Sequence, residues 1–388
     1  MVIQKKAGFR LIALLVVQPI QTQLSISWIE PSTQFLPTSN WKKESWKQDL
    51  PMGDIVEIRD FIDTYYHHFN AGEVRKAAQS LDKFLDDGGK IFLTLAGAMS
   101  TARIGKVLTS MINSGFIAGI SCTGANLEED VFLLTANSHF QVVEDWRSLS
   151  ADDETKLLEK KLNRVTDVCI PEDAAIRVIE QAMLPLWRKY SDSGNSALPH
   201  EFFYQMLNNS ELTFDGNPND SWVLAAANHN LPLFVPGWED STLGNIFASH
   251  VIQSDIKPSI VKSGIHYMTE LAEWYVSQTT KLAFFQIGGG IAGDFPICVV
   301  PMLNQDLQRQ APLWSWFCQI SEANPSYGGY SGAPPNEKIT WGKLAKETPR
   351  FCYRKRRDDS RPVDFRLSLR TALVYSVVLE VVGYESIK

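Results

Sequence analysis

Short apolar runs alternate with amphipathic stretches through the middle of the chain. Residues 91–95 form an apolar, strand-like run, residues 96–100 form a tight loop, and residues 104–112 place apolar side chains at helical spacing. Residues 116–121 are the next strand-like run. A strand, a helix and a second strand in this order make a βαβ unit, which predicts that the two strands pair in parallel.

The same order returns later in the chain. Further strand-like runs occupy residues 231–235, 283–287 and 314–320, and apolar spacing predicts a helix over residues 246–251. The repetition predicts the α/β class: a single doubly wound, mostly parallel sheet of Rossmann-like type with helices on both faces.

Regular structure is predicted to begin near Asp54, because apolar residues recur at helical spacing from residue 55 to residue 69. Residues 1–53 lack this periodicity and are predicted to be a non-core N-terminal extension. Basic residues before the apolar run 11–17 resemble the start of a signal peptide, but no small-x-small cleavage site follows. We therefore expect a cytoplasmic protein, with secretion as the alternative.

Charge and cysteine usage narrow the classes of function. The 388 residues carry a net charge of −7, so there is no general electrostatic case for binding nucleic acid or an anionic membrane. The five cysteines lie far apart without a CxxC pair, which indicates neither a metal site nor a disulfide framework. A reducing cytoplasm fits this pattern best.

Ligands of doubly wound sheets bind at the carboxyl ends of the strands, so the loops there are the places to look for chemistry. Four of these loops combine glycine or threonine with carboxylates: residues 123–130, 238–245, 288–294 and the segment that ends at Lys343. The run at 288–293 is not a strict GxGxxG and is by itself a weak dinucleotide signal.

Carboxylates are frequent in these loops, and we expect them to converge on one acidic rim that attracts a polycation. They are Glu128, Glu129, Asp130, Glu239, Asp240, Asp294 and Glu337. Aromatic side chains in the same loops suit ammonium groups and alkyl stems. The alternative for each acidic residue is a solvated loop end.

Lys343 in the sequence Trp341-Gly342-Lys343 is a candidate amine nucleophile, with Glu337 six positions upstream. Nucleophilic use requires that burial or a neighbouring charge favour the unprotonated amine. The alternative is a surface lysine in a turn beside a half-buried tryptophan.

Four motifs resemble the deoxyhypusine synthases, especially their bacterial deoxyhypusine synthase-like branch. They are CTGANLEED at 122–130, PGWEDSTLGN at 236–245, QIGGGIAGDFP at 286–296 and NEKITWGKL at 336–344. The resemblance covers residues 54–351 and implies a cytoplasmic homotetramer that binds NAD. It also implies that spermidine is oxidised, that 1,3-diaminopropane leaves, and that a lysine imine passes the aminobutyl group to an acceptor amine.

The resemblance implies roles for individual residues, with Lys343 as the imine-forming lysine. Positions that match NAD contacts are Thr123, Gly124, Ala125, Glu129, Asp240 and Gly289. Positions that match substrate contacts are Glu128, Glu129, Asn245, Asp294, Glu337 and Trp341.

Some positions depart from the family pattern. Asn245 and Tyr330 stand where the synthases have aspartates, and Asp294 stands where they have a histidine. These changes alter the number and position of the charges around the substrate amine, so the donor can be spermidine or a related polyamine. The acceptor can be a protein lysine or a small amine such as putrescine, which would give homospermidine.

The chain after Phe351 departs most from the family pattern. Residues 352–362 are a basic run that we expect to fit no core strand, where the family has a strand and a Ser-Asp-Ala turn. We hypothesise a frameshift just after Phe351, which would place the family's aspartate at Arg356; a genuine basic tail is the alternative.

Three functions therefore remain open. The first is aminobutyl transfer through Lys343, and the second is an inactive NAD- or polyamine-binding relative. The third is a plain amine dehydrogenase, which would not need the lysine.

Overall fold

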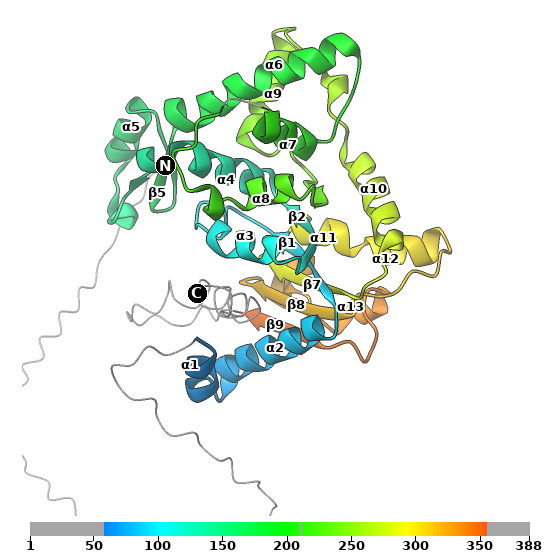
Figure 1. The fold of residues 1–388 in the computed structure, drawn as a ribbon. Helices are drawn as coiled ribbons and strands as arrows, with labels where there is room; N and C mark the ends of the chain where they lie inside the picture. Colours follow the sequence, from blue (N-terminus) through cyan, green and yellow to red (C-terminus); the bar gives the residue numbers. More distant parts are fainter. Residues whose placement is uncertain (1–57, 210–211, 355–388) are drawn as a thin grey trace, which may run out of the picture. The chain divides into compact units, whose positions relative to one another are not determined.

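The computed structural model describes residues 58–209 and 212–354, drawn in colour in Figure 1. The predicted extension 1–53 and the chain from residue 355 lie outside the described residues; they include Arg356, where the hypothesised frameshift would place the family's aspartate.

A six-stranded parallel sheet forms the centre of the fold, with the strand order β6-β2-β1-β7-β8-β9 (Figure 1). This is the order 3-2-1-4-5-6 of dinucleotide-binding folds, and the direction of winding reverses between β1 and β7. The predicted α/β fold class is confirmed. The strands are β1 (Lys90–Leu95), β2 (Ile117–Cys122), β6 (Leu233–Phe234), β7 (Leu282–Ile287), β8 (Trp316–Ser321) and β9 (Arg350–Arg354).

Both faces of the sheet are buried, which explains why its strands are continuous apolar runs. On one face, Phe92, Phe284 and Phe317 stand in register on β1, β7 and β8, with neighbouring ring centroids 6.0 and 6.1 Å apart. On the other face, Trp316 donates from Nε1 to Ser80 Oγ of α2 at 2.9 Å. Helices therefore lie against both faces of the sheet, as predicted: α2 (Phe69–Asp86) against Trp316, and α10 (Gly264–Ser277) against Phe92, whose ring centroid is 5.4 Å from that of Trp274.

The helices that surround the sheet agree with the predicted ones around α3 and α9. They are α1 (Ile58–Tyr65), α2 (Phe69–Asp86), α3 (Gly105–Asn113), α4 (Gly124–Ala136), α5 (Ala151–Glu159), α6 (Arg177–Ser193), α7 (Pro199–Asn209), α8 (Trp222–Asn228), α9 (Thr242–Ile252), α10 (Gly264–Ser277), α11 (Ile291–Ile297), α12 (Val299–Pro301) and α13 (Glu337–Thr340).

A small antiparallel sheet was not predicted. It has the order β3-β5-β4 and is formed by Gln141–Val142, Val168–Pro171 and Leu162–Val165. The strands have two to four residues, too few for a period-2 pattern to stand out in the sequence.

The single helix predicted over residues 55–69 is wrong in extent. Helix α1 ends at Tyr65, and α2 starts anew at Phe69, which has a φ of 54° and a side chain that is 94% exposed. A Cβ on Gly72 would lie 2.5 Å from the His67 carbonyl oxygen, so the glycine permits this sharp break. The apolar character of Phe69 continued the helical pattern although its side chain faces solvent.

The expectation that the basic run fits no core strand is wrong for its first three residues. Strand β9 continues through Arg354 and pairs in parallel with β8. Tyr353 is buried and its hydroxyl donates to the Glu73 carbonyl of α2. Alternation along the strand turns Phe351 and Tyr353 to the α2 side, which makes the segment compatible with the edge of the sheet.

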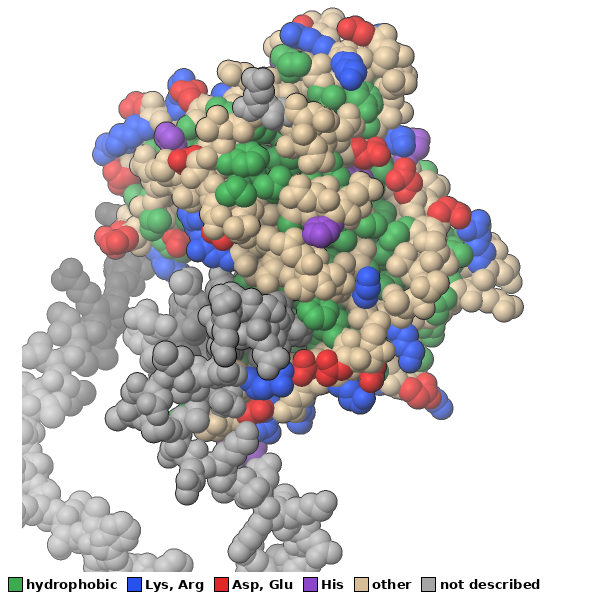
Figure 2. Space-filling view, in the orientation of Figure 1, with side chains coloured by type: hydrophobic (Ala, Val, Ile, Leu, Met, Phe, Trp, Pro, Cys, Tyr) green, Lys and Arg blue, Asp and Glu red, His purple; other side chains and the backbone are tan. Residues whose placement is uncertain are grey.

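Charged side chains on the visible face are mixed in sign (Figure 2). Along α1 and α2 they form exposed ion pairs, Arg59 with Asp82, Lys76 with Glu73 and Lys83 with Asp87. Such pairs contribute little stability each. Among the helices that the structure describes, none combines the length and the apolar composition of a membrane span.

Asp130 joins α4 to α8. Its carboxylate accepts from Ser221 Oγ at 2.6 Å and from the Val223 amide at 3.0 Å, which ties down the first turn of α8. Burial raises the pKa of Asp130 from 3.8 to about 7. The folded chain therefore holds this proton more tightly than the unfolded chain, and the stability it contributes at low pH is lost as the pH rises through 7.

We predict that Asp130→Asn removes this pH dependence. The free energy of unfolding, measured by urea denaturation from pH 4 to pH 7, should fall less steeply than in the parent, by up to about 1.4 kcal/mol per pH unit. Asp153→Asn is the control, because hydrogen bonds in the capping box of α5 lower the pKa of Asp153 to about 2, so it stays ionised from pH 4 to pH 7. An Asp130 variant with the parent's slope would contradict the assignment.

Candidate active site

Lys343 lies at the end of the crossover connection between β8 and β9. Its backbone carbonyl accepts from the Trp314 amide at 3.2 Å, near the start of β8. Its side chain is only 5% exposed, and its Nζ lies 4.9 Å from the ring centroid of Tyr330. Tyr330 in turn donates from its hydroxyl to Gln286 Oε1 at 3.4 Å, near the carboxyl end of β7. The lysine is therefore a buried amine and not a solvated turn residue.

A Schellman motif positions Lys343. The Gly342 amide donates to the Ile339 carbonyl at 3.0 Å, and the Lys343 amide donates to the Lys338 carbonyl at 3.0 Å. Gly342 has a φ of 66°, a left-handed conformation that glycine adopts without a steric penalty. The glycine between tryptophan and lysine is thus required by the turn that folds Lys343 back over α13.

Lys338 is a site residue that our reading of the sequence missed. Its side chain is 2% exposed, and its Nζ lies 4.5 Å from the Tyr330 ring centroid and 5.0 Å from that of Phe317. In a Schellman motif the third-last helical residue packs against the residue after the glycine. The spacing of Lys338 and Lys343 around Gly342 is the signal that could have found it.

Asp294 completes this group, which we call the lysine cluster: Lys338, Lys343, Tyr330 and Asp294. Burial raises the pKa of Asp294 from 3.8 to about 6, and the positive charges of Lys343 and Lys338 oppose that rise. Its Oδ1 is buried and accepts no hydrogen bond from the part of the chain that the structure describes. A carboxylate with a buried oxygen that lacks a hydrogen bond, close to buried amines, is suited to hold a further ammonium group.

Trp341 and Glu337 lie on the outer side of the lysine cluster. The Trp341 ring centroid is 5.5 Å from Lys343 Nζ, although its side chain is 61% exposed. Glu337 is exposed at the start of α13. Of these two predicted substrate contacts, Trp341 therefore lies next to Lys343 at the solvent side, and Glu337 is exposed one residue before Lys338.

The expected acidic rim is not gathered in one place. Residues 124–130 are helix and not loop, because α4 starts directly after β2. Glu128 is buried and accepts from the Thr242 and Leu243 amides at 2.9 and 2.8 Å, and Glu129 accepts from Thr101 Oγ1 at 2.6 Å. Glu239 and Asp240 are exposed. Most of the acidic residues thus hold the fold together or face solvent.

Loops that follow five strands, β1, β2, β6, β7 and β8, meet at the carboxyl edge of the sheet, around the winding reversal. Thr123 Oγ1 donates to the Gly97 carbonyl after β1 at 2.7 Å. A Cβ on Gly124 would lie 2.6 Å from Ser241 Cβ, beside Asp240 in the turn before α9. A Cβ on Gly289 would lie 2.0 Å from Ser331 Oγ in the loop after β8. These contacts bring most of the predicted cofactor residues to one edge.

This edge suits a dinucleotide. The first amides of α4, at Gly124 and Ala125, have no partner inside their helix and are available to a phosphate. Glycines with positive φ, Gly97 and Gly288, keep side chains away from the crevice. Exposed Asp240 and buried Glu129 offer carboxylates of the kind that bind ribose hydroxyls. Asn245, near the same turn, donates from Nδ2 to the Ser241 carbonyl at 2.7 Å.

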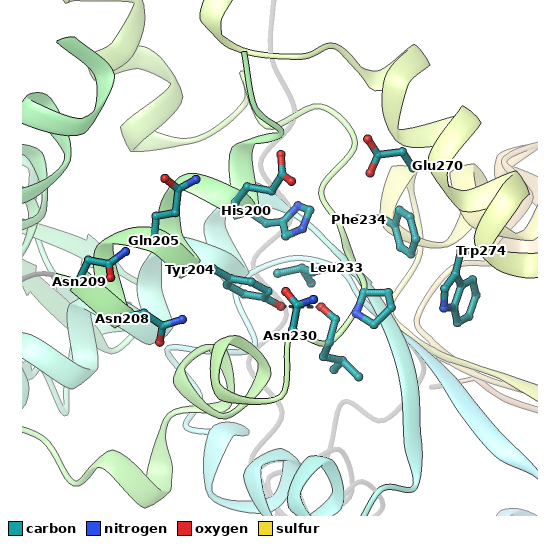
Figure 3. Close-up of a pocket in the computed structure, with 13 residues that line it drawn as sticks. His200, Tyr204, Gln205, Asn208, Asn209, Asn230, Leu233, Phe234, Glu270 and Trp274 are labelled. Carbon is teal, nitrogen blue, oxygen red and sulfur yellow. Dashed lines mark hydrogen bonds between the residues drawn. The ribbon is translucent and has the colours of Figure 1, made fainter. Parts of the chain in front are cut away.

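A cavity of about 580 Å³ lies elsewhere, at edge strand β6 (Figure 3). Its walls come from α7, β6 and α10, and include His200, Tyr204, Asn230 and Trp274. Tyr204 donates from its hydroxyl to the Leu231 carbonyl at 2.9 Å across it. None of the predicted site residues lines this cavity. Over the described ranges no group of three or more His, Cys, Asp or Glu residues is placed to hold a metal ion.

Comparison with known proteins identifies the family of this chain. The family model described as deoxyhypusine synthase matches residues 60–353. A deoxyhypusine synthase-like protein of Cyanothece sp. is 27% identical over 309 residues, covering 76% of this chain and 74% of the relative. The protein of the same description from Nostoc sp. is 27% identical over 311 residues, covering 76% of each chain.

An archaeal relative is similar over the same region. The protein named "Probable deoxyhypusine synthase 2" of Methanosarcina acetivorans is 26% identical over 284 residues, covering 72% of this chain and 76% of its own length. Together with the match of the family model, these similarities show that the chain belongs to the deoxyhypusine synthase family.

Proposed function

We propose that this protein transfers an aminobutyl group from spermidine, or a related polyamine, to an acceptor amine through an imine on Lys343. The observation that carries the proposal is the placement of Lys343. Its amine is buried, lies against Tyr330 and Trp341, and shares the site with an ionisable carboxylate at Asp294. Membership in the deoxyhypusine synthase family supports aminobutyl transfer in general terms.

NAD is the cofactor in this proposal. When bound, its nicotinamide would accept the hydride that leaves the polyamine carbon and would return it to the imine formed on the acceptor amine, so that the transfer is redox-neutral. The α4 amides, Gly289, Asp240 and Glu129 are the groups that we expect to hold it. The resemblance also implies a cytoplasmic homotetramer, and we include both in the proposal.

Residues of the lysine cluster carry the transfer. The Lys343 amine attacks the electrophilic carbon of the oxidised donor, the diamine leaves, and the aminobutyl group remains on Nζ as an imine. Asp294 pairs with an ammonium group of the polyamine, which orients the carbon toward Nζ. Trp341 covers the alkyl stem from the solvent side.

A putrescine acceptor is the second candidate. The position where the synthases have an aspartate is Asn245, an exposed amide that binds the Ser241 carbonyl. Without that carboxylate the site offers one negative charge fewer to the three ammonium groups of spermidine. Putrescine has only two ammonium groups, so fewer carboxylates suffice to bind it as the acceptor.

Trapping tests the central step. Incubation with NAD and labelled spermidine, followed by borohydride, should place the label on Lys343 and release 1,3-diaminopropane. Lys343→Arg should abolish the label, and Lys346→Arg, a change at an exposed lysine, should not. Transfer of hydride to NAD without an adduct would favour a dehydrogenase. Absence of both the hydride transfer and the adduct would favour an inactive binding relative.

Gly342→Ala should separate the effect of the turn on the position of Lys343 from its effect on the stability of the fold. Alanine at this left-handed position costs about 1 kcal/mol and disturbs the turn that orients Lys343, so the adduct yield should fall at least several-fold. Gly115→Ala is a matched control, because Gly115 has a φ of 75° in the same motif at the end of α3. Urea denaturation should show similar losses in both variants, and an equal loss of adduct in both would contradict the positioning role.

Asp294 should make amine binding depend on pH. Its carboxylate must be ionised to pair with an ammonium, so the affinity for putrescine or spermidine should weaken as the pH falls through about 6. Asp294→Asn should bind at least tenfold more weakly at pH 8 and lose this dependence in calorimetric titrations. Glu239→Gln, a change at an exposed acid, should behave as the parent; parental affinity in the Asp294→Asn variant would rule out the pairing.

A further inference from the structure

Two buried groups of opposite charge in the lysine cluster are not hydrogen-bonded to each other. The Nζ of Lys338 and the Oδ1 of Asp294 are both sealed from solvent, and neither has a hydrogen-bond partner among the residues that the structure describes. Buried charged groups normally have partners, because the removal of a charge from water is costly. An unpartnered pair of opposite sign therefore suggests a ligand that carries both signs.

Aromatic rings satisfy Lys338 only in part. Its Nζ lies 4.5 Å from the ring centroid of Tyr330 and 5.0 Å from that of Phe317. A cation–π contact stabilises the positive charge, but it does not use the three N–H donors of an ammonium group. These donors are suited to a carboxylate, which accepts charge-assisted hydrogen bonds.

Lys338 and Asp294 carry opposite charges at pH 7. Burial lowers the pKa of Lys338 to about 8 and raises the pKa of Asp294 to about 6. The charges of Asp294 and Glu337 favour the ammonium form of Lys338. Cys352 on the neighbouring strand acts in the same direction, and the charge of Lys343 opposes it.

Lys343 lies within reach of the same ligand. The Schellman motif fixes the two lysines as neighbours, since the Lys343 amide donates to the Lys338 carbonyl at 3.0 Å. The Nζ of Lys343 lies 4.9 Å from the ring centroid of Tyr330, the ring that Lys338 also contacts. A molecule attached to Lys343 therefore meets a positive donor and a negative acceptor in one cluster.

We propose that the acceptor is a diamino acid: Lys338 binds its carboxylate, Asp294 binds its α-ammonium, and its side-chain amine attacks the imine on Lys343. The inference rests on the proposed transfer through Lys343 and names the class of acceptor. Putrescine, a plain diamine, would leave Lys338 without a partner and fits the site less well. Binding requires the flexible stem of Lys338 to turn its Nζ toward the ligand.

The transfer to a diamino acid balances in atoms and electrons. Departure of the diamine frees Asp294 for the acceptor. The unprotonated side-chain amine attacks the imine carbon, the bond from that carbon to Lys343 Nζ breaks, and the lysine amine is released. The hydride taken from the donor then reduces the new carbon–nitrogen double bond to a secondary amine, with a proton from solvent. The product is an amino acid with an aminobutyl group on its side-chain nitrogen.

L-ornithine and putrescine form a matched pair of probes, because ornithine is putrescine with a carboxylate on one terminal carbon. Calorimetric titration of the full chain at pH 7, without NAD or spermidine, compares their affinities. Ornithine should bind at least about tenfold more tightly, since its carboxylate gains hydrogen bonds to a buried cation. Equal or tighter binding of putrescine, or no binding of ornithine, would overturn the inference.

Variants of Lys338 identify the group that recognises the carboxylate. Lys338→Met, which has an apolar chain of similar length, should bind ornithine about tenfold more weakly without weakening putrescine. Lys338→Gln is a second neutral variant, and Lys338→Arg should keep the preference. Lys346→Met removes an exposed charge nearby and should behave as the parent. Parental affinity for ornithine in both neutral variants would contradict the role of Lys338.

A product assay separates this inference from the proposed reaction. Incubation with NAD, spermidine and ornithine should yield aminobutyl-ornithine, detected by mass spectrometry. An adduct on Lys343 that passes to putrescine and not to ornithine would overturn the acceptor class alone. A binding preference for ornithine with no adduct on Lys343 would support the diamino acid site and overturn the proposed transfer.

Discussion

Parallel pairing of β1 with β7 is the constraint on which the rest of the structure depends. These two strands begin the two halves of the sheet, and the chain winds away from their junction in opposite directions. The loops that follow them are held side by side: the Ala96 amide donates to the Ile287 carbonyl, and a Cβ on Gly288 would lie 2.7 Å from Ala96 Cβ. Each glycine-rich segment then faces the same crevice, because parallel strands all end at one edge.

The sequence predicted the sheet well because buried parallel strands are apolar throughout and stand out between amphipathic helices. It also directed attention to Lys343, because its motif is local, and the structure shows that this side chain is buried. The hydrogen-bond partners of the carboxylates could not be predicted from the sequence. Glu128, for example, accepts from the Thr242 amide of α9, which lies 114 residues later in the chain. The same holds for Tyr353, whose place at the sheet edge depends on contact with Glu73 of α2. Lys338 was missed for another reason: its burial beside Tyr330 follows from turn geometry and not from residue type.

The acidic residues of α4 show how one motif can serve the fold. Glu128, Glu129 and Asp130 are consecutive, so they point in different directions around the helix and reach α9, Thr101 and α8. Each carboxylate satisfies donors that would otherwise be buried and unpaired. The acidic residues whose charges act within the lysine cluster are therefore Asp294 and Glu337, and not the consecutive carboxylates of α4.

The connection between β8 and β9 affects how the sequence of this protein can evolve. In most doubly wound folds a full helix joins neighbouring parallel strands and packs as part of the core. Here the connection contains short turns and the four-residue helix α13, and it supplies Tyr330, Lys338 and Lys343. Substitutions within this one segment can alter the charge and shape of the site while the strands on both sides keep their register. Substrate preference and the stability of the sheet can thus evolve separately.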